Sequence, residues 1–434
     1  MVQLNKMPKK LHYHLRNRIY LQIQKKKKMK VFKYLSFIVF TCCIVNISNA
    51  QFSLTGEFRP RTEFNHGYKT LANTDQDWSI PTSQRSRLNV MFSHEIVKTK
   101  LTLQDVRYWG SQPQLVNNED YAVSVHEAWA DVVLAKNFSL KAGRQELVYD
   151  DHRIFGNVGW TQQARSHDLA LFKFENSFKL HFGIAHHENS NITNNIYDGP
   201  DAYKDLQFAW FNKTWNKNTL SLLFLNNGIP VMENEKQVSK FSQTMGGRYS
   251  ITVGSVALAA NLYYQSGKHI SGKDISALNY LFEASLKNSF TAGYEFLSGN
   301  SYDKNDKNYA FNPLYGTNHK FNGFMDYFFV GNHINSVGLN DIYLKYKLSE
   351  KKIGFNADLH YFASAGKISA DAGNYLGTEI DLSLSYKVHE IASLSAGWST
   401  MLASESMELI KGGDHKAGNH WGYIMLSVTP TFIK

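Results

Sequence analysis

Residues 51–64 read QFSLTGEFRPRTEF, and their side chains alternate strictly between two kinds. In an extended chain, Leu54, Gly56, Phe58 and Pro60 share one face. The other face holds Ser53, Thr55, Glu57, Arg59, Arg61 and Glu63. Alternation over about ten residues is typical of a membrane β-barrel strand, which presents apolar side chains to lipid and polar ones to a lumen. A helix would scatter these apolar positions around its circumference.

The same period-two pattern recurs along the chain. The next strand sets Arg85, Arg87 and Asn89 against Leu88 and Val90. Further candidate strands lie at 99–110, 122–133, 169–175, 179–187, 205–215, 218–227, 244–252, 255–265, 276–287, 289–299, 336–348, 352–364, 376–388, 391–402 and 419–432. Longer polar segments at 65–82, 111–121, 188–204, 228–243, 300–335 and 403–418 are predicted to face outward. The sequence thus predicts an all-β protein: a transmembrane antiparallel β-barrel of about 18 strands, forming one domain over residues 51–434.

The first 50 residues are predicted to be a basic extension followed by a signal peptide. Lys30 and Lys33 form a charged region, residues 31–45 are mostly apolar, and small residues lead up to Ala50. The apolar run is too short and too interrupted to favour a spanning helix. We therefore expect cleavage near Ala50 and delivery to a bacterial outer membrane, with outer-membrane lipid around the barrel. A cytoplasmic basic tail on an anchored protein is the alternative.

The charge of the whole chain is misleading. It has 47 Lys and Arg, of which 11 lie in residues 1–50, so 36 remain against 37 acids and the net charge of residues 51–434 is about −1. The basic character therefore gives no support for nucleic-acid binding.

Both cysteines, Cys42 and Cys43, lie in the leader, so residues 51–434 can use no disulfide or thiolate chemistry. We expect no cofactor.

Residues 140–168 read LKAGRQELVYDDHRIFGNVGWTQQARSHD and concentrate charge. This stretch holds three arginines and four acids beside Trp160 and two glycines. Charge within a series of barrel strands cannot face lipid, so it must face the lumen. The stretch is therefore predicted to form part of the constriction of a pore.

Several segments, taken in order, resemble the alginate export porins of Gram-negative outer membranes. They are GEFRPRTEF at 56–64, QRSRLNV at 84–90, LQDVRYWG at 103–110, GRQELVYDDHRIFGNVGWTQQARSHD at 143–168, GYEFLSGN at 293–300 and FNPLYGTNHKFNGFMDYF at 311–328. The resemblance implies an 18-stranded barrel with an arginine-rich conduit for an anionic uronic-acid polymer. The implied conduit cations are Arg59, Arg61, Arg85, Arg87, Arg107, Arg144, Arg153 and Arg165, and the implied acidic partners are Asp105, Asp151 and Asp168. His167 departs from the pattern, because an aromatic residue is expected there. A periplasmic partner is left open.

The distribution of arginine fits this expectation. Eight of the nine arginines after residue 50 lie between 59 and 165, and only Arg248 lies outside. A guanidinium binds a carboxylate bidentately, whereas an ammonium is a hydrated point charge. A structural role is an equal alternative for each arginine, because residues 51–175 contain 14 basic and 15 acidic residues. The arginines could then cross-link the wall.

Three functions remain open at this point. The first is passive passage of an anionic polysaccharide or oligosaccharide, and the second is a less selective porin for small solutes. The third is a barrel enzyme acting on lipid, although no spacing singles out a catalytic Ser–His pair. His319 and Asp326 are better explained by an ordered loop that packs on or into the barrel, with Phe321, Phe324 and Tyr327 as anchors. We expect no metal site and no catalytic residue.

Overall fold

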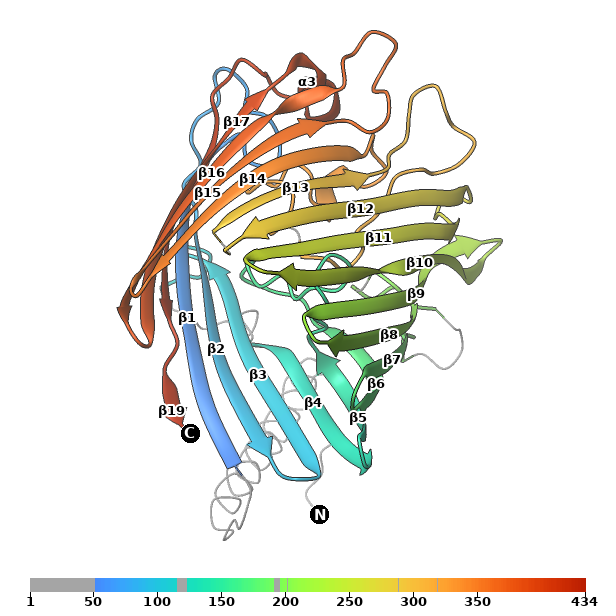
Figure 1. The fold of residues 1–434 in the computed structure, drawn as a ribbon, viewed down its shortest axis with the longest axis vertical. Coiled ribbons are helices and arrows are strands. Elements are labelled where there is room, and N and C mark those ends of the chain that lie inside the picture. The colour runs from blue at the N-terminus through green and yellow to red at the C-terminus, as the bar shows by residue number, and fades with distance from the viewer. Residues whose placement is uncertain (1–50, 115–122, 191–195, 201, 288, 318) are drawn as a thin grey trace, which may run out of the picture. The chain divides into compact units, whose positions relative to one another are not determined.

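The computed structural model describes residues 51–434 apart from 115–122, 191–195, 201, 288 and 318 (Figure 1). Most of this part is antiparallel β-sheet. The expected signal peptide and its cleavage site near Ala50 lie outside the described residues. Among the described residues, no helix has the length and apolar character needed to cross a membrane.

The strands follow one another in chain order. Their bounds are β1 Gln51–His66, β2 Thr82–Ser93, β3 Val97–Tyr108, β4 Ser124–Ala135, β5 Phe138–Gln145, β6 His167–Glu175, β7 Lys179–His186, β8 Asp205–Trp215, β9 Asn218–Glu233, β10 Lys236–Val253, β11 Val256–Lys268, β12 Asp274–Leu286, β13 Phe290–Leu297, β14 Leu339–Glu350, β15 Ile353–Ala363, β16 Tyr375–His389, β17 Ala392–Ala403, β18 Asn419–Val428 and β19 Thr431–Ile433. Two short helices, α2 (Val330–His333) and α3 (Glu405–Lys411), lie in the connections.

The sheet closes on itself between its first and last strands. Each strand pairs with its neighbour in sequence, and β1 pairs with β2 on one side and with β18 and β19 on the other. β18 and β19 are two parts of one last strand, interrupted near Pro430, which has no N–H to donate. The predicted 18-stranded antiparallel barrel is thus confirmed, and closure leaves no unpaired sheet edge.

The two rims of the barrel differ. At one rim, which we call the short-turn rim, connections such as 136–137, 216–217 and 351–352 have only two residues. At the other, the long-loop rim, the connections include 67–81, 146–166, 187–204, 298–338, 364–374 and 404–418. Positive φ angles at Asn137 and Asn216 allow the tight turns, because asparagine tolerates the left-handed region.

One expected outward segment is a hairpin instead. Residues 228–243 were predicted from their polarity to be a connection, but β9 runs to Glu233 and β10 begins at Lys236. This hairpin extends past the ends of its neighbours (Figure 1). Beyond the apolar band of a barrel both faces of a strand can be polar, so the loss of alternation there did not mark the end of a strand.

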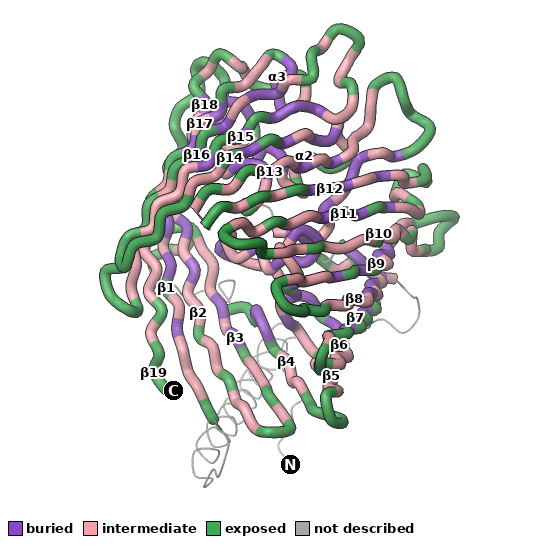
Figure 2. Tube along the Cα trace, viewed as in Figure 1, coloured by how far each residue is buried: buried purple, intermediate pink, exposed green. Residues whose placement is uncertain are grey.

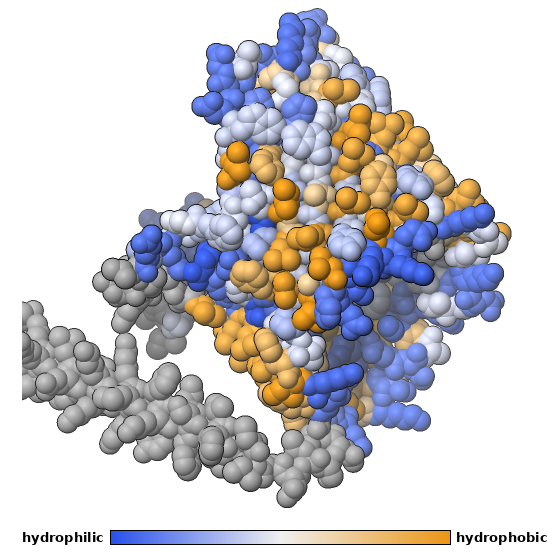
Figure 3. Space-filling model, turned by 90° about the vertical axis from the view of Figure 1, so that its left-hand side faces the viewer, coloured by the Kyte–Doolittle hydropathy of each residue, from blue (hydrophilic) through white to orange (hydrophobic). Residues whose placement is uncertain are grey.

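The outer face of the barrel is apolar. Alternate residues of β12, including Tyr280, Phe282 and Leu286, point away from the lumen, and so do Leu344 of β14 and Leu359 of β15. Figure 3 shows such hydrophobic side chains over the middle of one face, with hydrophilic ones at its upper end. This is the surface that a lipid bilayer requires of a spanning barrel.

The core lies inside the barrel, where segments from the long-loop rim fold back. Buried Leu206 and Phe208 of β8 and Leu225 of β9 face inward and pack with Tyr149 and Phe155 of the β5–β6 connection. Figure 2 shows buried stretches along many of the strands, separated by intermediate and exposed residues. Fully burying a Phe155-sized side chain contributes roughly 1.5–3 kcal/mol. Strands in this part of the wall are therefore apolar on both faces.

Candidate functional site

The connection between β5 and β6, residues 146–166, crosses the lumen, and we call it the first inner segment. At one end it lies against β1, where Arg59 donates to the carbonyl oxygens of Gly159 and Thr161 at 2.9 Å each. At the other end Asp151 accepts from Arg248 of β10 at 2.7 Å. Because these contacts involve strands far apart around the barrel, the segment bridges opposite walls. The stretch that was predicted to form part of a pore constriction therefore lies across the lumen.

A second inner segment, residues 311–328, lies beside the first. The N–H of Gly156 donates to the carbonyl of Tyr315 at 2.9 Å, and the N–H of Thr317 donates to the carbonyl of His152 at 2.9 Å. Phe155 and Tyr315 form an isolated parallel β-bridge. The two segments are therefore joined to each other inside the barrel.

The second inner segment packs into the barrel as predicted. Phe324 stacks on His319 with ring centroids 4.8 Å apart, and the Arg153 guanidinium carbon lies 4.6 Å from the centre of the Phe321 ring. Tyr327 is fully buried and donates a hydrogen bond to the carbonyl of Gly67. The side chain of Asp326 accepts from Tyr68 at 2.5 Å. All three aromatic anchors expected from the sequence are engaged.

One wall of the lumen is basic. Arg59, Arg61, Arg85 and Arg87 lie on the inner face of β1 and β2. Arg59, Arg85 and Arg87 surround Glu57, which is 2.5 Å from Arg85, and Arg61 lies 3.6 Å from Glu63. Most of their hydrogen bonds go to the first inner segment. Arg61 donates to the carbonyl of Trp160 at 2.8 Å, while its Nε has no hydrogen-bond partner among the described residues. These guanidinium groups therefore face the lumen and hold the inner segment at the same time.

A second stretch of the wall is acidic. Buried carboxylates line the inner face of β13 to β16, namely Glu295, Asp341, Asp358, Glu379 and Asp381. They bind the inner segments by accepting from the N–H of Met325 at 2.8 Å and from the side-chain amide of Asn322 at 2.9 and 3.0 Å. Arg153 of the first inner segment forms an ion pair with Glu295 at 2.7 Å. The lumen thus has a basic stretch of wall at β1 and β2 and an acidic stretch at β13 to β16.

These acids were not predicted from the sequence. They are spread over residues 295–381, in stretches such as GYEFL at 293–297 and LNDIYL at 339–344, and only Glu379 and Asp381 share a strand. The sequence feature that could have identified them is an acid at an inward-facing position of a strand, where residues alternate between lumen and lipid. The strand pairing brings them together: Glu295 lies opposite Asp341, and Asp358 opposite Asp381.

Asp105 and Arg107 lie on the other face of the wall from Arg85 and Arg87. In the β2–β3 register Arg85 is opposite Val106, whereas Asp105 is opposite Ser86 and Arg107 is opposite Gln84. Directly opposite residues share a face of the sheet. Asp105 and Arg107 therefore pair with each other, at 2.7 Å, on the outer face near the long-loop rim. The expectation that both line the lumen is corrected by this register.

Arg144 and Asp168 are likewise on the outer face. Arg144 lies opposite Ala128 of β4 and opposite Asp168 of β6, with which it forms a 2.6 Å ion pair. The two side chains are 38% and 48% exposed. Near the end of a strand the outward face leaves the hydrocarbon region, so an outward ion pair is tolerated there.

The remaining predicted residues, Asp151, Arg153 and Arg165, belong to the first inner segment. Arg165 donates to the carbonyl of Gly316 at 3.2 Å, and burial lowers the pKa of its guanidinium. His167, where an aromatic residue was expected, is buried and stacks on Tyr203 with centroids 5.9 Å apart. Its ring therefore occupies the place of an aromatic side chain.

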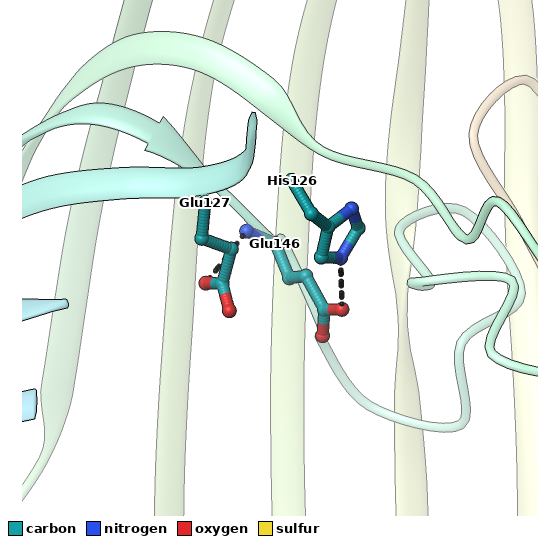
Figure 4. Close-up of side chains that lie close together, drawn as sticks. All are labelled: His126, Glu127 and Glu146. Atoms are coloured by element: carbon teal, nitrogen blue, oxygen red, sulfur yellow. Dashed lines mark hydrogen bonds and ion pairs between the residues drawn. The ribbon is translucent and has the colours of Figure 1, made fainter. Parts of the chain in front are cut away.

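A β-bulge brings His126, Glu127 and Glu146 together in the lumen (Figure 4). His126 Nε2 lies 2.8 Å from Glu146, and Glu127 pairs with Lys100. One imidazole and two carboxylates are a donor set suited to a divalent metal, and their ligand atoms lie within 4.8 Å of one another. Each carboxylate is, however, already bound by protein donors. Burial alone would raise the pKa of Glu146, but hydrogen bonds from His126 and Asn157 outweigh it and lower that pKa.

A second such cluster lies in the 404–418 connection of the long-loop rim. Glu408, Asp414 and His415 have ligand atoms within 4.8 Å of one another. The N–H and the ring of His415 both contact Glu408, which lowers the pKa of that carboxyl group. Thr74 donates to Asp414 at 2.6 Å. These contacts tie the 404–418 connection to the 67–81 connection.

A polar cavity of about 220 Å³ lies between the basic wall and the two inner segments. Its lining includes Arg61, Tyr68, Trp160, His319 and Asp326. Trp160 lies between His319, stacked at 4.3 Å, and the Arg61 guanidinium, whose carbon is 4.2 Å from the ring centre. The indole N–H of Trp160, like Arg61 Nε, is buried and has no partner among the described residues.

No family model matches the sequence, and no curated protein matches it. Solved structures do match, among them three from Pseudomonas aeruginosa. OccK9 (OpdG) has a TM-score of 0.58 at 14% identity, over 88% of this chain and 99% of that one. OccK8 (OprE) gives 0.58 at 13% over the same shares, and the outer membrane protein OpdK gives 0.56 at 12%, also over 88% and 99%. None of these three structures is an alginate export porin, so they do not support the resemblance to that family. They show that this chain shares their barrel fold.

Proposed function

We propose that this protein is an outer-membrane porin through which small hydrophilic solutes diffuse passively. The observation that carries the proposal is a closed 18-stranded barrel whose lumen is crossed by two inner segments between a basic and an acidic wall. Such a lumen suits water and polar solutes, and the likeness of the fold to OpdK supports the outer membrane as its location. The proposal requires no catalytic residue, cofactor or metal.

The arrangement of the arginines favours limited selectivity over a dedicated polymer conduit. Arg59 makes three hydrogen bonds to backbone carbonyls of the first inner segment, and Arg153 is buried against Glu295. Guanidinium groups used in this way have few donors left for a passing carboxylate. Arg107 and Arg144 lie on the outer face.

Passage of an anionic oligosaccharide, alginate-like in its carboxylates, is the second candidate. One observation favours it: Arg61 and Trp160, which line the polar cavity, each have a buried N–H without a partner among the described residues. These side chains would have to turn toward the cavity for a carboxylate to accept from them. Weak contacts of this kind are what transport needs, because a strong site would trap its solute.

Single-channel recording on the purified barrel tests both candidates. We expect steady conductance in KCl and only brief, weak interruptions when an oligouronate is added. Long blocks at low oligouronate concentration would favour the second candidate. The absence of any conductance from a folded barrel would refute the proposal.

A further inference from the structure

The short-turn rim carries many exposed lysines. Within the described residues, exposed lysines in its turns and at the adjoining strand ends are Lys98, Lys136, Lys179, Lys213, Lys217, Lys287, Lys347, Lys351, Lys352 and Lys387. Exposed acids in the same turns and strand ends are Glu95, Glu175, Glu350 and Glu390. Ten lysines against four acids give this rim a clear positive excess.

Four of these lysines face the lumen. Lys98 lies directly opposite inward Asp131, and Lys179 is two residues before the inward His181. Lys347 and Lys387 continue the inward positions of β14 and β16, which include Asp341 and Asp381 deeper in the barrel. We call Lys98, Lys179, Lys347 and Lys387 the mouth lysines.

The mouth lysines differ from the lysines deeper in the lumen. Lys100 pairs with Glu127, Lys173 with Asp131, and Lys345 with Asp358. Among the described residues, no carboxylate lies within ion-pair distance of any of the four mouth lysines. None of the four is therefore held in an ion pair with the wall, although Lys98 lies opposite Asp131 and Lys179 opposite Glu175 in the strand register.

The long-loop rim has the opposite balance. Among the described residues, its exposed acids are Asp75, Asp77, Asp168, Glu188, Asp198, Glu233, Glu235, Asp274, Asp303, Asp306, Asp371 and Glu405, and its exposed lysines are Lys236, Lys268, Lys273, Lys304, Lys307, Lys367 and Lys416. Several of these lysines are paired with an acid, as Lys268 is with Asp274 and Lys367 with Asp303. The fixed charge of the barrel thus changes sign from one rim to the other.

We infer that the mouth lysines make the short-turn end of the lumen a collecting vestibule for small anions, and that the channel is anion-preferring and electrically asymmetric. The inference rests on the proposed porin function. A mouth lined by one sign of charge raises the local concentration of counter-ions, and lysine rings select anions in pores. Ammonium groups attract a hydrated anion without the bidentate grip of a guanidinium. Solutes with carboxylate or phosphate groups are the class whose local concentration at the mouth should rise.

Salt should control the effect. The Debye length is about 10 Å at 0.1 M salt and about 3 Å at 1 M, so a ring of exposed charges acts across the mouth only in dilute salt. Anion preference and rectification of the current should therefore be strong near 0.1 M KCl and weak at 1 M.

The test is a reversal-potential measurement across a planar bilayer under a KCl gradient, with current–voltage curves at both salt levels. The variant replaces the four mouth lysines together: Lys98→Gln, Lys179→Gln, Lys347→Gln and Lys387→Gln. The matched control replaces four long-loop lysines: Lys268→Gln, Lys273→Gln, Lys304→Gln and Lys307→Gln. Heat-modifiable migration on a gel first verifies that each barrel is folded.

We expect the wild type to prefer chloride at low salt and the mouth variant to lose at least about threefold in the chloride-to-potassium permeability ratio. The control should keep the preference. A conducting mouth variant with unchanged selectivity and rectification would overturn the inference and leave the porin proposal intact, whereas a folded wild type that never conducts would overturn both. If the mouth variant does not fold, the four single Lys→Gln variants serve, and the absence of any decrease in the ratio among them would equally refute the inference.

Discussion

The Arg153–Glu295 pair illustrates what single residues contribute inside this barrel. Both side chains are almost completely buried, at 4% and 1% exposure, and the two charges lie 2.7 Å apart. Asn279 and Asn322 donate to the carboxylate of Glu295 as well. A buried pair adds little net stability, but removing one partner leaves a costly unpaired charge. The pair therefore fixes where the first inner segment meets the acidic wall.

Glu295→Gln should release the inner segments from β13. Breaking a buried pair in this way costs about 3–5 kcal/mol, and here the cost falls on the docking of residues 146–166. Hydrogen exchange at the amides of Gly156 and Thr317, which join the two inner segments, should speed up strongly.

The control for this variant is Asp168→Asn, which breaks the exposed Arg144–Asp168 pair. An exposed pair contributes only about 0.2–1 kcal/mol, so the inner amides should exchange as in the wild type. Equal exchange in both variants would contradict the assigned role of Glu295.

Lys411 gives a residue-scale prediction about pH. It is buried at the end of α3, where its Nζ donates to the carbonyl of Asn332 at 2.8 Å, and burial lowers its pKa to about 7. An unfolded lysine keeps its proton up to about pH 10.4. Between these values the unfolded 404–418 connection binds a proton that the folded one lacks, so its folding stability should rise with pH from about 7 to 10.

Proteolysis of the 404–418 connection, corrected for the pH profile of the protease on an unfolded peptide, measures this effect. Cleavage should slow as pH rises in the wild type, and Lys411→Met should remove the dependence. Lys416→Met, at an exposed lysine of the same connection, should retain it. A pH dependence that persists in Lys411→Met would assign the effect to another group.

At the scale of elements, the first inner segment depends on strands that are distant in sequence. Its carbonyl groups at Gly159, Trp160 and Thr161 have no regular backbone ladder and are satisfied by guanidinium groups from β1 and β2. Buried carbonyls without donors are costly, so this supply of donors is a condition for the segment to lie inside the barrel. The main role of the arginines of β1 and β2 is therefore to hold the first inner segment in the lumen.

Removing Arg59 and Arg61 together should free the first inner segment from β1. If these arginines mainly hold the segment, the Arg59→Ala/Arg61→Ala variant should conduct more current, with larger open-channel noise. If they mainly serve as an anion path, the same variant should conduct less anion current. Single-channel recording distinguishes the two directions.

Arg107→Ala/Arg144→Ala is the matched control, because both arginines lie on the outer face. Conductance and noise in this variant should equal those of the wild type. A clear change in conductance would contradict the register that places the two residues outside.

The alternation of residues predicted the strands, but it did not predict for every residue whether its side chain points into the lumen or outward. In β3, Leu101 and Leu103 face outward, and Asp105 and Arg107 follow them on the same face because the register continues without a shift in the β2–β3 pair. Polarity identifies the inward face only within the apolar band, and near the rim it loses that meaning. For the same reason the sequence placed a connection at 228–243, where the β9–β10 hairpin continues.

On the scale of the whole molecule, closure decides which contacts exist. The strand number and the barrel fold followed from period-two patterning, because each strand carries its own signal. The charged site did not follow in full, because its acidic half joins residues of β13 to β16 that only the closed sheet brings into one lumen with β1 and β2. The sequence of one strand does not show which residues of other strands share the lumen with it.

Closure also yields a prediction about the last residues. β19 pairs with the first residues of β1, and the N–H of Gly56 donates to the carbonyl of Pro430 at 2.9 Å. Deleting residues 431–434 should leave the start of β1 as an open edge, so less protein should refold into the heat-modifiable form. Replacing Lys434 alone with Gln should have no such effect. Full refolding of the deletion would indicate that β18 suffices for closure.

The joined inner segments have a mechanical consequence. A hollow cylinder of 18 strands can flatten under lateral pressure from the bilayer, since nothing inside an empty tube resists a change from a round to an oval outline. Here the first inner segment contacts Arg59 of β1 at one end and, through Asp151 and Arg153, Arg248 of β10 and Glu295 of β13 at the other. The segment therefore connects distant parts of the wall. The bore should therefore keep its outline in bilayers of different thickness and tension.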